Sequence, residues 1–455
     1  MNIQRRAGLA VLSGLAANSF AGSAFGQGGP SSNPRPSQPE QEETDARSTL
    51  QNRMSEYITG FRRRFARESG LIVGSGIGQV RQLSDHPDWV KLRSLAFEQA
   101  VLEAQRAFVI AGGARIAGDS ALSLFRAANQ EPPSFQRQNI DQPGVLPDLT
   151  RRILAVARGR LDNELRELGI DPVALERVPE AQRHVQFANE LQLNAVRRAF
   201  GELVGTGPIR TFEESDGKGQ YYIGAVVAGS HRRKSIAQQI LTRQGQFEPI
   251  EDPDKRTDLG SLVTNLGELV DDFGVRLIDD ENGLPVLVSF YQWGVDYQGT
   301  DRARAGMARQ AAEAQAEAQA DRQIAEFLAA NAEFAEAARA GVAEETAALR
   351  NADGSIGQQP TITSLTDRVW RSMRRQARVD NLPGIYTLRN WSARHPESNQ
   401  RIIGCVRVWS AVSEIAMREY RNAPRPTATI VAPTAPSQGR PSSRSSRELV
   451  GGRDF

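Results

Sequence analysis

The sequence predicts an α+β protein built from repeated helix–β-hairpin–helix modules. Hydrophobic residues recur at helical spacing in several long segments, and pairs of short β-rich runs separated by turn residues lie between them. A hairpin of this kind buries one face under flanking helices, so antiparallel sheets covered by helices are expected. One long alanine-rich helix and two disordered tails complete the predicted architecture.

The first 26 residues have the layout of a secretory signal peptide. Arg5 and Arg6 form a positive start, and residues 7–20 are a short apolar run. The small residues Ala24 and Gly26 stand where a signal peptidase requires small side chains. We therefore expect an exported chain that is periplasmic or extracellular.

Cysteine content, hydropathy and charge disfavour disulfide-linked, lipid-anchored, membrane-spanning and nucleic-acid-binding proteins. The single cysteine, Cys405, allows no internal disulfide, and no cysteine follows the predicted cleavage site to carry a lipoprotein anchor. No later run of about 18 apolar residues is found, so we expect no transmembrane helix. The 56 Lys and Arg residues nearly balance the 54 Asp and Glu residues, which disfavours nucleic acid as a partner.

A strand and a helix are expected to open the folded part. Residues 71–80 read as a strand in which Gly74, Gly76 and Gly78 permit a bulge or close packing against another strand. Their G-x-G-x-G spacing differs from the G-x-G-x-x-G of a dinucleotide-binding loop. The pattern predicts a helix over 87–110, with Asp85 as its N-cap and a stop at Gly112 and Gly113. Further helices are expected at 119–130, 149–168, 180–204, 231–241, 259–273, 365–379 and 410–420.

Three β-hairpins are predicted after these first elements. The first joins 209–213 to 221–227 around Asp216-Gly217, and the second joins 275–278 to 285–293 around Asn282-Gly283. The third joins 385–392 to 401–409 around His395-Pro396. Two strands alone are marginally stable in water, so each hairpin must join a larger sheet or rest on helices.

The segment from Ala303 to Leu349 is expected to form one very long helix, since alanine has the highest helix propensity. Ile324, Phe327 and Leu328 are its expected packing anchor, and Gly341 is its expected bend or stop. It is read as a solvated connector packed at one end, or as a docking arm.

These segments suggest a division of the chain into seven parts. They are a signal peptide (1–26), a disordered linker (27–48), a strand–helix module with a helical extension (49–170), α+β modules at 171–255, 256–350 and 351–422, and a disordered basic tail (423–455).

Chemistry-bearing residues are scattered. The four histidines, His86, His184, His231 and His395, lack the spacing of a zinc site. The densest acidic patch, at 271–272 and 279–281, lacks EF-hand spacing and is expected to be solvated. We expect no cofactor, no metal and no catalytic residues.

Aromatic residues concentrate in the second half of the chain. Tyr291, Trp293, Trp391 and Trp409 lie at or near predicted strand ends. Such residues are most often the edge of a core, but a cluster of them could also form a partner surface. We take these four as the candidate partner surface.

The strand and helix of the first module resemble the small α/β envelope modules of flagellar assembly protein T and related outer-membrane lipoproteins. The shared pattern is a G-x-G strand followed by a helix of the form R-x-x-A-x-x-x-A-x-x-x-A, here Gly74, Gly76, Arg93, Ala96, Ala100 and Ala104. A helix and hairpin at 190–227 are similar in style. The resemblance covers about a quarter of the chain and implies no catalytic residues, and the lipid-anchor cysteine is missing.

We therefore expect an exported, non-enzymatic interaction or scaffold protein of a bacterial envelope, with a protein or envelope partner. Two alternatives remain open. One is an oligomeric subunit associated with secretion or a pore, and the other is an exported hydrolase of cell-wall material that uses a pair of carboxylates.

Overall fold

The described part of the chain has an α+β fold, as predicted. The computed structural model describes residues 45–133, 139–142, 144–157, 161–217, 219–243, 246–297, 299–329, 361–373 and 384–422. The expected signal peptide, most of the expected linker and the expected basic tail lie outside these residues. Helix α1 begins at Ala46, so the predicted linker is too long at its C-terminal end.

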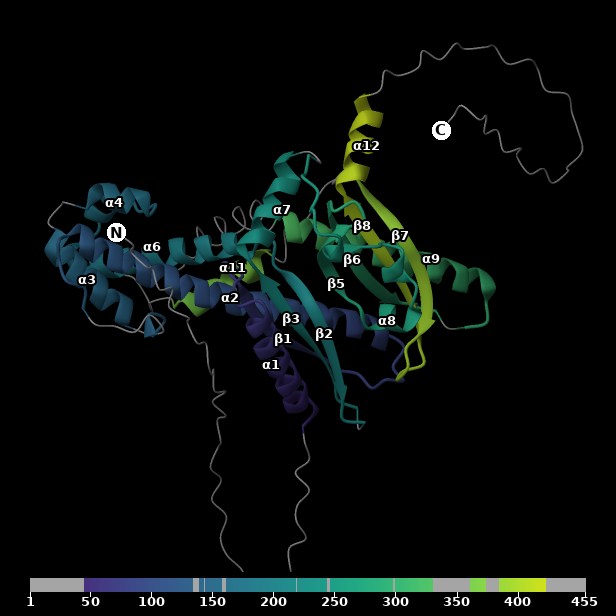
Figure 1. Ribbon diagram of the computed structural model, residues 1–455. Coiled ribbons are helices and arrows are strands. Elements are labelled where there is room, and N and C mark those ends of the chain that lie inside the picture. Colours follow the sequence, from purple (N-terminus) through teal and green to yellow (C-terminus); the bar gives the residue numbers. More distant parts are fainter. Residues whose placement is uncertain are drawn as a thin grey trace, which may run out of the picture. The chain divides into compact units, whose positions relative to one another are not determined.

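The helices and strands alternate along the chain (Figure 1). The helices are α1 (Ala46–Arg64), α2 (Trp89–Ala127), α3 (Val145–Ala157), α4 (Asp162–Glu167), α5 (Pro172–Glu176), α6 (Glu180–Phe200), α7 (His231–Arg243), α8 (Leu266–Asp271), α9 (Arg302–Ala329), α11 (Ile362–Met373) and α12 (Ala411–Asn422). The strands are β1 (Ile72–Val80), β2 (Gly207–Ser215), β3 (Tyr221–Gly229), β4 (Arg256–Thr257), β5 (Gly274–Asp280), β6 (Pro285–Gly294), β7 (Ile385–Arg394) and β8 (Arg401–Ser410).

The three predicted hairpins are confirmed, and they are distributed over two sheets. Hairpin β2–β3 joins β1 in a three-stranded antiparallel sheet of order β1-β3-β2. Hairpins β5–β6 and β7–β8 share a five-stranded sheet of order β4-β5-β6-β8-β7, in which β6 pairs with β8 from Val286 to Gly294. The strands predicted for modules 256–350 and 351–422 therefore complete one another in a single sheet.

Helices α1 and α2 cover opposite faces of the three-stranded sheet. Leu50 and Met54 of α1 pack on the face that carries Tyr222 and Val226. Ala96 and Ala100 of α2 belong to the core on the opposite face. Figure 1 shows α1 alongside β1, β2 and β3.

The glycines of β1 and the alanines of α2 occur where the two backbones pack closely together. A β-carbon added at Gly78 would overlap the carbonyl oxygen of Ala96, and one at Gly76 would overlap that of Ala100. Strand β1 pairs with β3 without a register shift, so its glycines form no bulge. They permit close packing, and the tightly packed partner is a helix rather than another strand.

Helix α2 is much longer than predicted, and it absorbs the separate helix expected at 119–130. Gly112 and Gly113 do not stop it. A β-carbon at Gly112 would lie 3.3 Å from Cβ of Ala199 in α6, and one at Gly113 would lie 3.0 Å from Cγ2 of Ile362 in α11. The two glycines thus serve close helix–helix packing inside a continuous helix.

Two further helix predictions are also wrong. Asp85 is not the N-cap of α2, because that position belongs to Asp88, whose carboxylate accepts a bond from Lys91. The segment expected as one helix at 259–273 contains a short 3₁₀ turn (Ser261–Val263) and then α8, with Asn265 capping α8 through its side chain.

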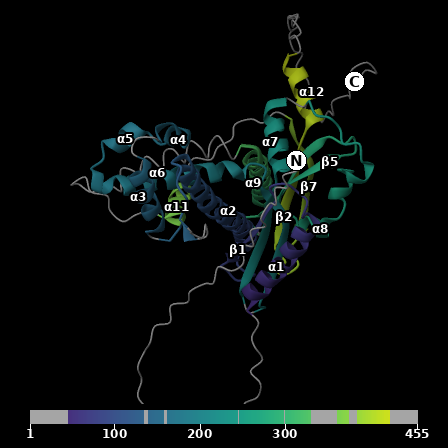
Figure 2. The same ribbon diagram turned by 60° about the vertical axis from the view of Figure 1, so that its left-hand side comes forward.

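The distal half of α2 lies in a helical region. Helices α3 and α6 pack against it, and Figure 2 shows α3, α4, α5 and α6 gathered around one end of α2. The buried core there includes Leu124 and Phe125 of α2, Ile153 of α3 and Phe187 of α6.

Helix α9 covers one face of the five-stranded sheet. Its Ala316 and Ala320 pack on Tyr291 and Cys405. The expected anchor of Ile324, Phe327 and Leu328 is confirmed, since all three side chains are buried. The described helix ends at Ala329, so the remainder of the helix predicted to Leu349 lies outside the described residues.

Among the described helices, α2 is long and apolar enough, by length and composition alone, to cross a membrane. Its most apolar stretch of 18 residues has a mean hydropathy of 1.3, and 39% of that stretch is buried. Charged residues such as Arg106, Arg115 and Asp119 interrupt α2, so it contains no uninterrupted apolar run of about 18 residues. The absence of a transmembrane helix stays a prediction.

We predict that Gly78→Ala lowers the free energy of unfolding by about 2 kcal/mol, because the new methyl group must push β1 away from the rigid backbone of α2. Gly60→Ala is the matched control. No atom lies within 4 Å of its added β-carbon in the exposed C-terminal part of α1, so it should stabilise by about 0.5–1 kcal/mol. Urea unfolding measures both, and equal effects would contradict the packing.

Candidate functional site

The most buried charged residue among those described is Arg93, whose side chain is fully enclosed. Its Nε donates to Oε2 of Glu213 at 3.1 Å, and its Nη2 also pairs with the same carboxylate. Nη1 donates to Oε1 of Gln292 at 2.8 Å, and Nη2 donates to the carbonyl oxygen of Val270 at 2.9 Å. One side chain of α2 thereby contacts β2, β6 and α8.

Glu213 gathers further donors around this pair. The hydroxyl of Tyr221 on β3 donates to it, and Nε2 of His395 lies 3.8 Å from Oε2. Burial alone would raise the pKa of Glu213, but the charge of Arg93 and the bonds from His395, Arg93 and Tyr221 outweigh it and hold the pKa at about 2. Glu213 is therefore ionised at all ordinary pH values.

The environment also fixes the protonation of His395. Its pKa is lowered, first by burial and then by the Arg93 charge, against the opposing pull of Glu213. Its Nδ1 accepts from the backbone amides of Glu397 and Ser398, which assigns the proton of the neutral ring to Nε2, facing Glu213. The pKa of Tyr221 is raised by burial and by the Glu213 charge.

Aromatic rings enclose the cluster. Arg93 lies over the ring of Phe273, with its guanidinium carbon 4.8 Å from the ring centroid. Trp89 packs against His395, with a centroid distance of 4.7 Å. Each charged group faces a partner, and the partners come from both sheets and α2. This cluster works as a cross-link that orients the sheets on α2.

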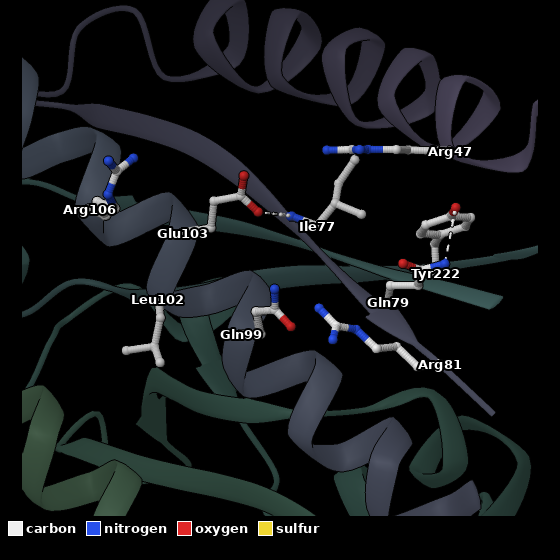
Figure 3. Close-up of a pocket in the computed structure, with 9 residues that line it drawn as sticks. All are labelled: Arg47, Ile77, Gln79, Arg81, Gln99, Leu102, Glu103, Arg106 and Tyr222. Carbon is white, nitrogen blue, oxygen red and sulfur yellow. Dashed lines mark hydrogen bonds between the residues drawn. The ribbon is translucent and has the colours of Figure 1, made fainter. Parts of the chain in front are cut away.

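An open hollow of about 300 Å³ lies where α1 and α2 approach strand β1 (Figure 3). It is lined by residues of α1, α2, β1 and β3 and the residue after β1, namely Arg47, Ile77, Gln79, Arg81, Gln99, Leu102, Glu103, Arg106 and Tyr222. Three arginines and one carboxylate give it an excess of positive charge.

The arginines of this arginine-lined hollow differ in their bonding. Arg106 is held by Asp367 of α11 through two bonds, and this pairing raises its pKa. The exposed guanidinium groups of Arg47 and Arg81 make no hydrogen bond or ion pair within the described part of the chain. Glu103 accepts from the backbone amide of Ile77 at 3.1 Å. The two free cations are thus available to an anionic group.

A second hollow of about 460 Å³ contains the first acidic pair found in the sequence. Burial raises the pKa of both Asp271 and Asp272, and Asp272 pairs with Arg276. Asp280 of the other acidic run caps the β5–β6 turn by accepting from the amides of Asn282 and Leu284. Within the described ranges, no three His, Cys, Asp or Glu residues are grouped so that they could hold a metal ion.

The four candidate aromatic residues do not form an exposed patch. Tyr291, Trp391 and Trp409 are 1%, 7% and 0% exposed, and Trp293 is half-buried. Tyr291 and Trp293 stack at a centroid distance of 6.5 Å. Trp391 lies over Gly404, where a β-carbon would collide with its ring. Trp409 belongs to the core around α6. Their aromatic surface is used inside the protein.

Sequence reasoning missed the roles of Glu213, Tyr221 and His395, and it placed Arg93 only within a motif. Arg93 and Glu213 are 120 residues apart along the chain, so no local spacing signals their contact. The available signal was a carboxylate at the end of a β-rich run, at a position that needs a partner if its face is buried.

We predict that Glu213→Gln lowers the free energy of unfolding by about 3 kcal/mol, because it leaves Arg93 charged and buried without a counterion. Glu202→Gln is the control, since Glu202 pairs with Arg115 on the surface. That change should cost less than about 1 kcal/mol. Urea denaturation compares the two, and similar losses would refute a buried-charge effect.

Acidification should destabilise the protein through the same cluster. The pKa of His395 is lowered from 6.5 in the folded state, so its contribution is complete above pH 6.5 and is lost as the pH falls below that value. The Glu213 contribution is complete above pH 4.5 and is lost as the pH falls toward 2. Thermal unfolding between pH 8 and 3 should show a smaller decline between pH 6.5 and 4.5 in His395→Gln than in the wild type. An unchanged slope would exclude His395 as a contributor.

Comparisons with known proteins concern fold and domain only. A family described as a domain of unknown function (DUF6844) matches residues 146–242, a segment that includes Glu213 and Tyr221 but neither Arg93 nor His395. No curated protein matches the chain. The fold is similar to the crystal structure of a hypothetical protein from Francisella tularensis, with a TM-score of 0.50 and 18% identity over 82% of this chain and 93% of that chain.

Proposed function

We propose that this chain is an exported interaction protein of a bacterial envelope and that it binds an acidic protein partner through the arginine-lined hollow. The signal-peptide pattern of residues 1–26 supports export. The resemblance of the β1–α2 module to envelope modules supports the envelope as its place of action. The partner is defined by its chemistry, which is a surface carrying carboxylates.

The free guanidinium groups of Arg47 and Arg81 are the observation that carries this proposal. Both side chains are exposed at a concave surface, and the described chain supplies neither with a carboxylate. The chain as a whole is nearly balanced in charge, so this local excess is not a consequence of composition. Complementary charge on a partner would raise the association rate and fix the orientation of binding.

The rigid elements around the hollow also suit a binding surface. Its walls belong to α1, α2, β1 and β3, and the close α2–β1 packing fixes the strand against the helix. A rigid surface loses little conformational entropy when a partner binds, and this raises affinity for a given contact area.

We predict that a photo-crosslinking residue placed at Gln99 captures a partner in envelope fractions, and that Arg47→Glu combined with Arg81→Glu abolishes the adduct by repelling carboxylates. Arg401→Glu is the control, because Arg401 is exposed on β8 and makes no ion pair within the described residues. Sequencing of the processed chain should find a new N-terminus at Gln27.

Two results would contradict the proposal. An unprocessed chain confined to the cell interior would remove the exported role. An adduct that survives both charge reversals would show that the captured protein does not use the arginines.

A further inference from the structure

We propose that the free edge of β1 receives an extended acidic segment of the partner as an additional β-strand. This inference rests on the proposed function and adds the mode of recognition. Strand β1 lies at the border of the sheet of order β1-β3-β2, and the arginine-lined hollow lies along that border. Strand addition supplies main-chain hydrogen bonds from the edge and specificity from flanking side chains.

The hydrogen bonds identify which backbone groups point outward. Arg62 of α1 donates to the carbonyl oxygen of Val73 at 2.9 Å, and the amide of Ile77 donates to Glu103 of α2. In an antiparallel pair, alternate residues direct both backbone groups away from the neighbouring strand. Val73, Ser75, Ile77 and Gln79 therefore form the outward-facing set.

Two side chains occupy part of this edge and leave the rest open. Arg62 takes one carbonyl and Glu103 takes one amide. The outward amides and carbonyls of Ser75 and Gln79 have no partner within the described part of the chain. Exposed strand edges are ready templates for pairing with another chain. The present edge thus has open positions on both sides of a single carboxylate.

The side chains around the edge select for acidic residues. Arg81 follows β1 directly and Arg47 stands at the start of α1, on the side of the sheet that carries Tyr222. Figure 3 shows Arg81 extending toward Gln99 and Glu103 extending toward Ile77. Leu102 of α2 adds an apolar contact on the opposite side of the sheet, for the side chains between the acidic ones. An alternating acidic and apolar strand matches this surface.

Glu103 competes with the incoming strand. Its carboxylate holds the Ile77 amide, and it also repels acidic side chains. Strand addition must release this amide, which then donates to a carbonyl of the added strand. The geometry therefore makes Glu103 an internal occupant of the edge that the partner displaces.

The experiment uses the processed full-length chain and an acetylated, amidated hexapeptide of alternating Glu and Val labelled with a fluorophore. Fluorescence anisotropy at low and physiological salt measures its affinity. A Lys–Val peptide should bind at least tenfold more weakly. Arg81→Glu should weaken the acidic peptide at least tenfold, and Glu103→Ala should tighten it several-fold. Arg421→Glu, on the exposed end of α12, should change nothing.

Backbone N-methylation separates strand addition from simple charge attraction. Methyl groups on alternate residues remove either the amides that face β1 or those that face away. One of the two methylated peptides should bind at least fivefold more weakly than the parent peptide, since each lost main-chain bond contributes about 1 kcal/mol. The other methylated peptide should bind as the parent peptide does.

The possible results distinguish strand addition from charge attraction alone. Equal affinity of both methylated peptides, with Arg81→Glu still weakening binding, overturns strand addition and leaves the acidic binding site intact. Binding of the acidic peptide that is insensitive to Arg81→Glu, or its absence, overturns this inference. In that case the Gln99 crosslink still decides whether the hollow binds a folded acidic partner.

Discussion

The buried pair of Arg93 and Glu213 is the constraint on which the arrangement of the described chain depends. A guanidinium group without water must find acceptors for its donors, and a lone buried charge is far more costly than a paired one. Arg93 meets this demand with a carboxylate of β2, an amide of β6 and a carbonyl of α8. The two sheets therefore have one satisfactory orientation on α2.

Close packing fixes α2 on the other side. Glycines in β1 and alanines in α2 let the two backbones approach until no β-carbon fits between them. Helix α2 thus packs a small-residue stripe on the three-stranded sheet and places its buried arginine between β2 of that sheet and β6 of the five-stranded one. A consequence is that β1 remains an edge strand with α1 on one side and α2 on the other, and the arginine-lined hollow lies along this edge.

The local part of the fold could be predicted from the sequence. The turn at Asn282-Gly283 and the Asp216-Gly217 loop were recognised because each needs a glycine, and both glycines have positive φ angles of 79° and 67°. Hydrophobic spacing located α6 and α7 well. The anchor of α9 was found because three large apolar side chains stand out in an alanine-rich segment.

The non-local part could not be predicted. Gly112 and Gly113 read as a helix stop, but their role depends on Ala199 and Ile362 from distant segments. The pairing of β6 with β8 joins residues more than a hundred positions apart, so it left no local pattern. The aromatic residues were recognised as a group, but burial against Gly404 and α9 decides that they lie inside. The arginine-lined hollow was missed because its charges come from three separate elements.

Hydrogen exchange of Arg93→Lys tests the central claim most directly. Lysine keeps the charge but carries its three donors on one nitrogen, and without the planar guanidinium fork it cannot reach Glu213, Gln292 and the Val270 carbonyl at once. The account predicts that amides of β2 and β6 lose protection together and by similar factors. Faster exchange confined to one sheet, or unchanged exchange in both, would contradict it.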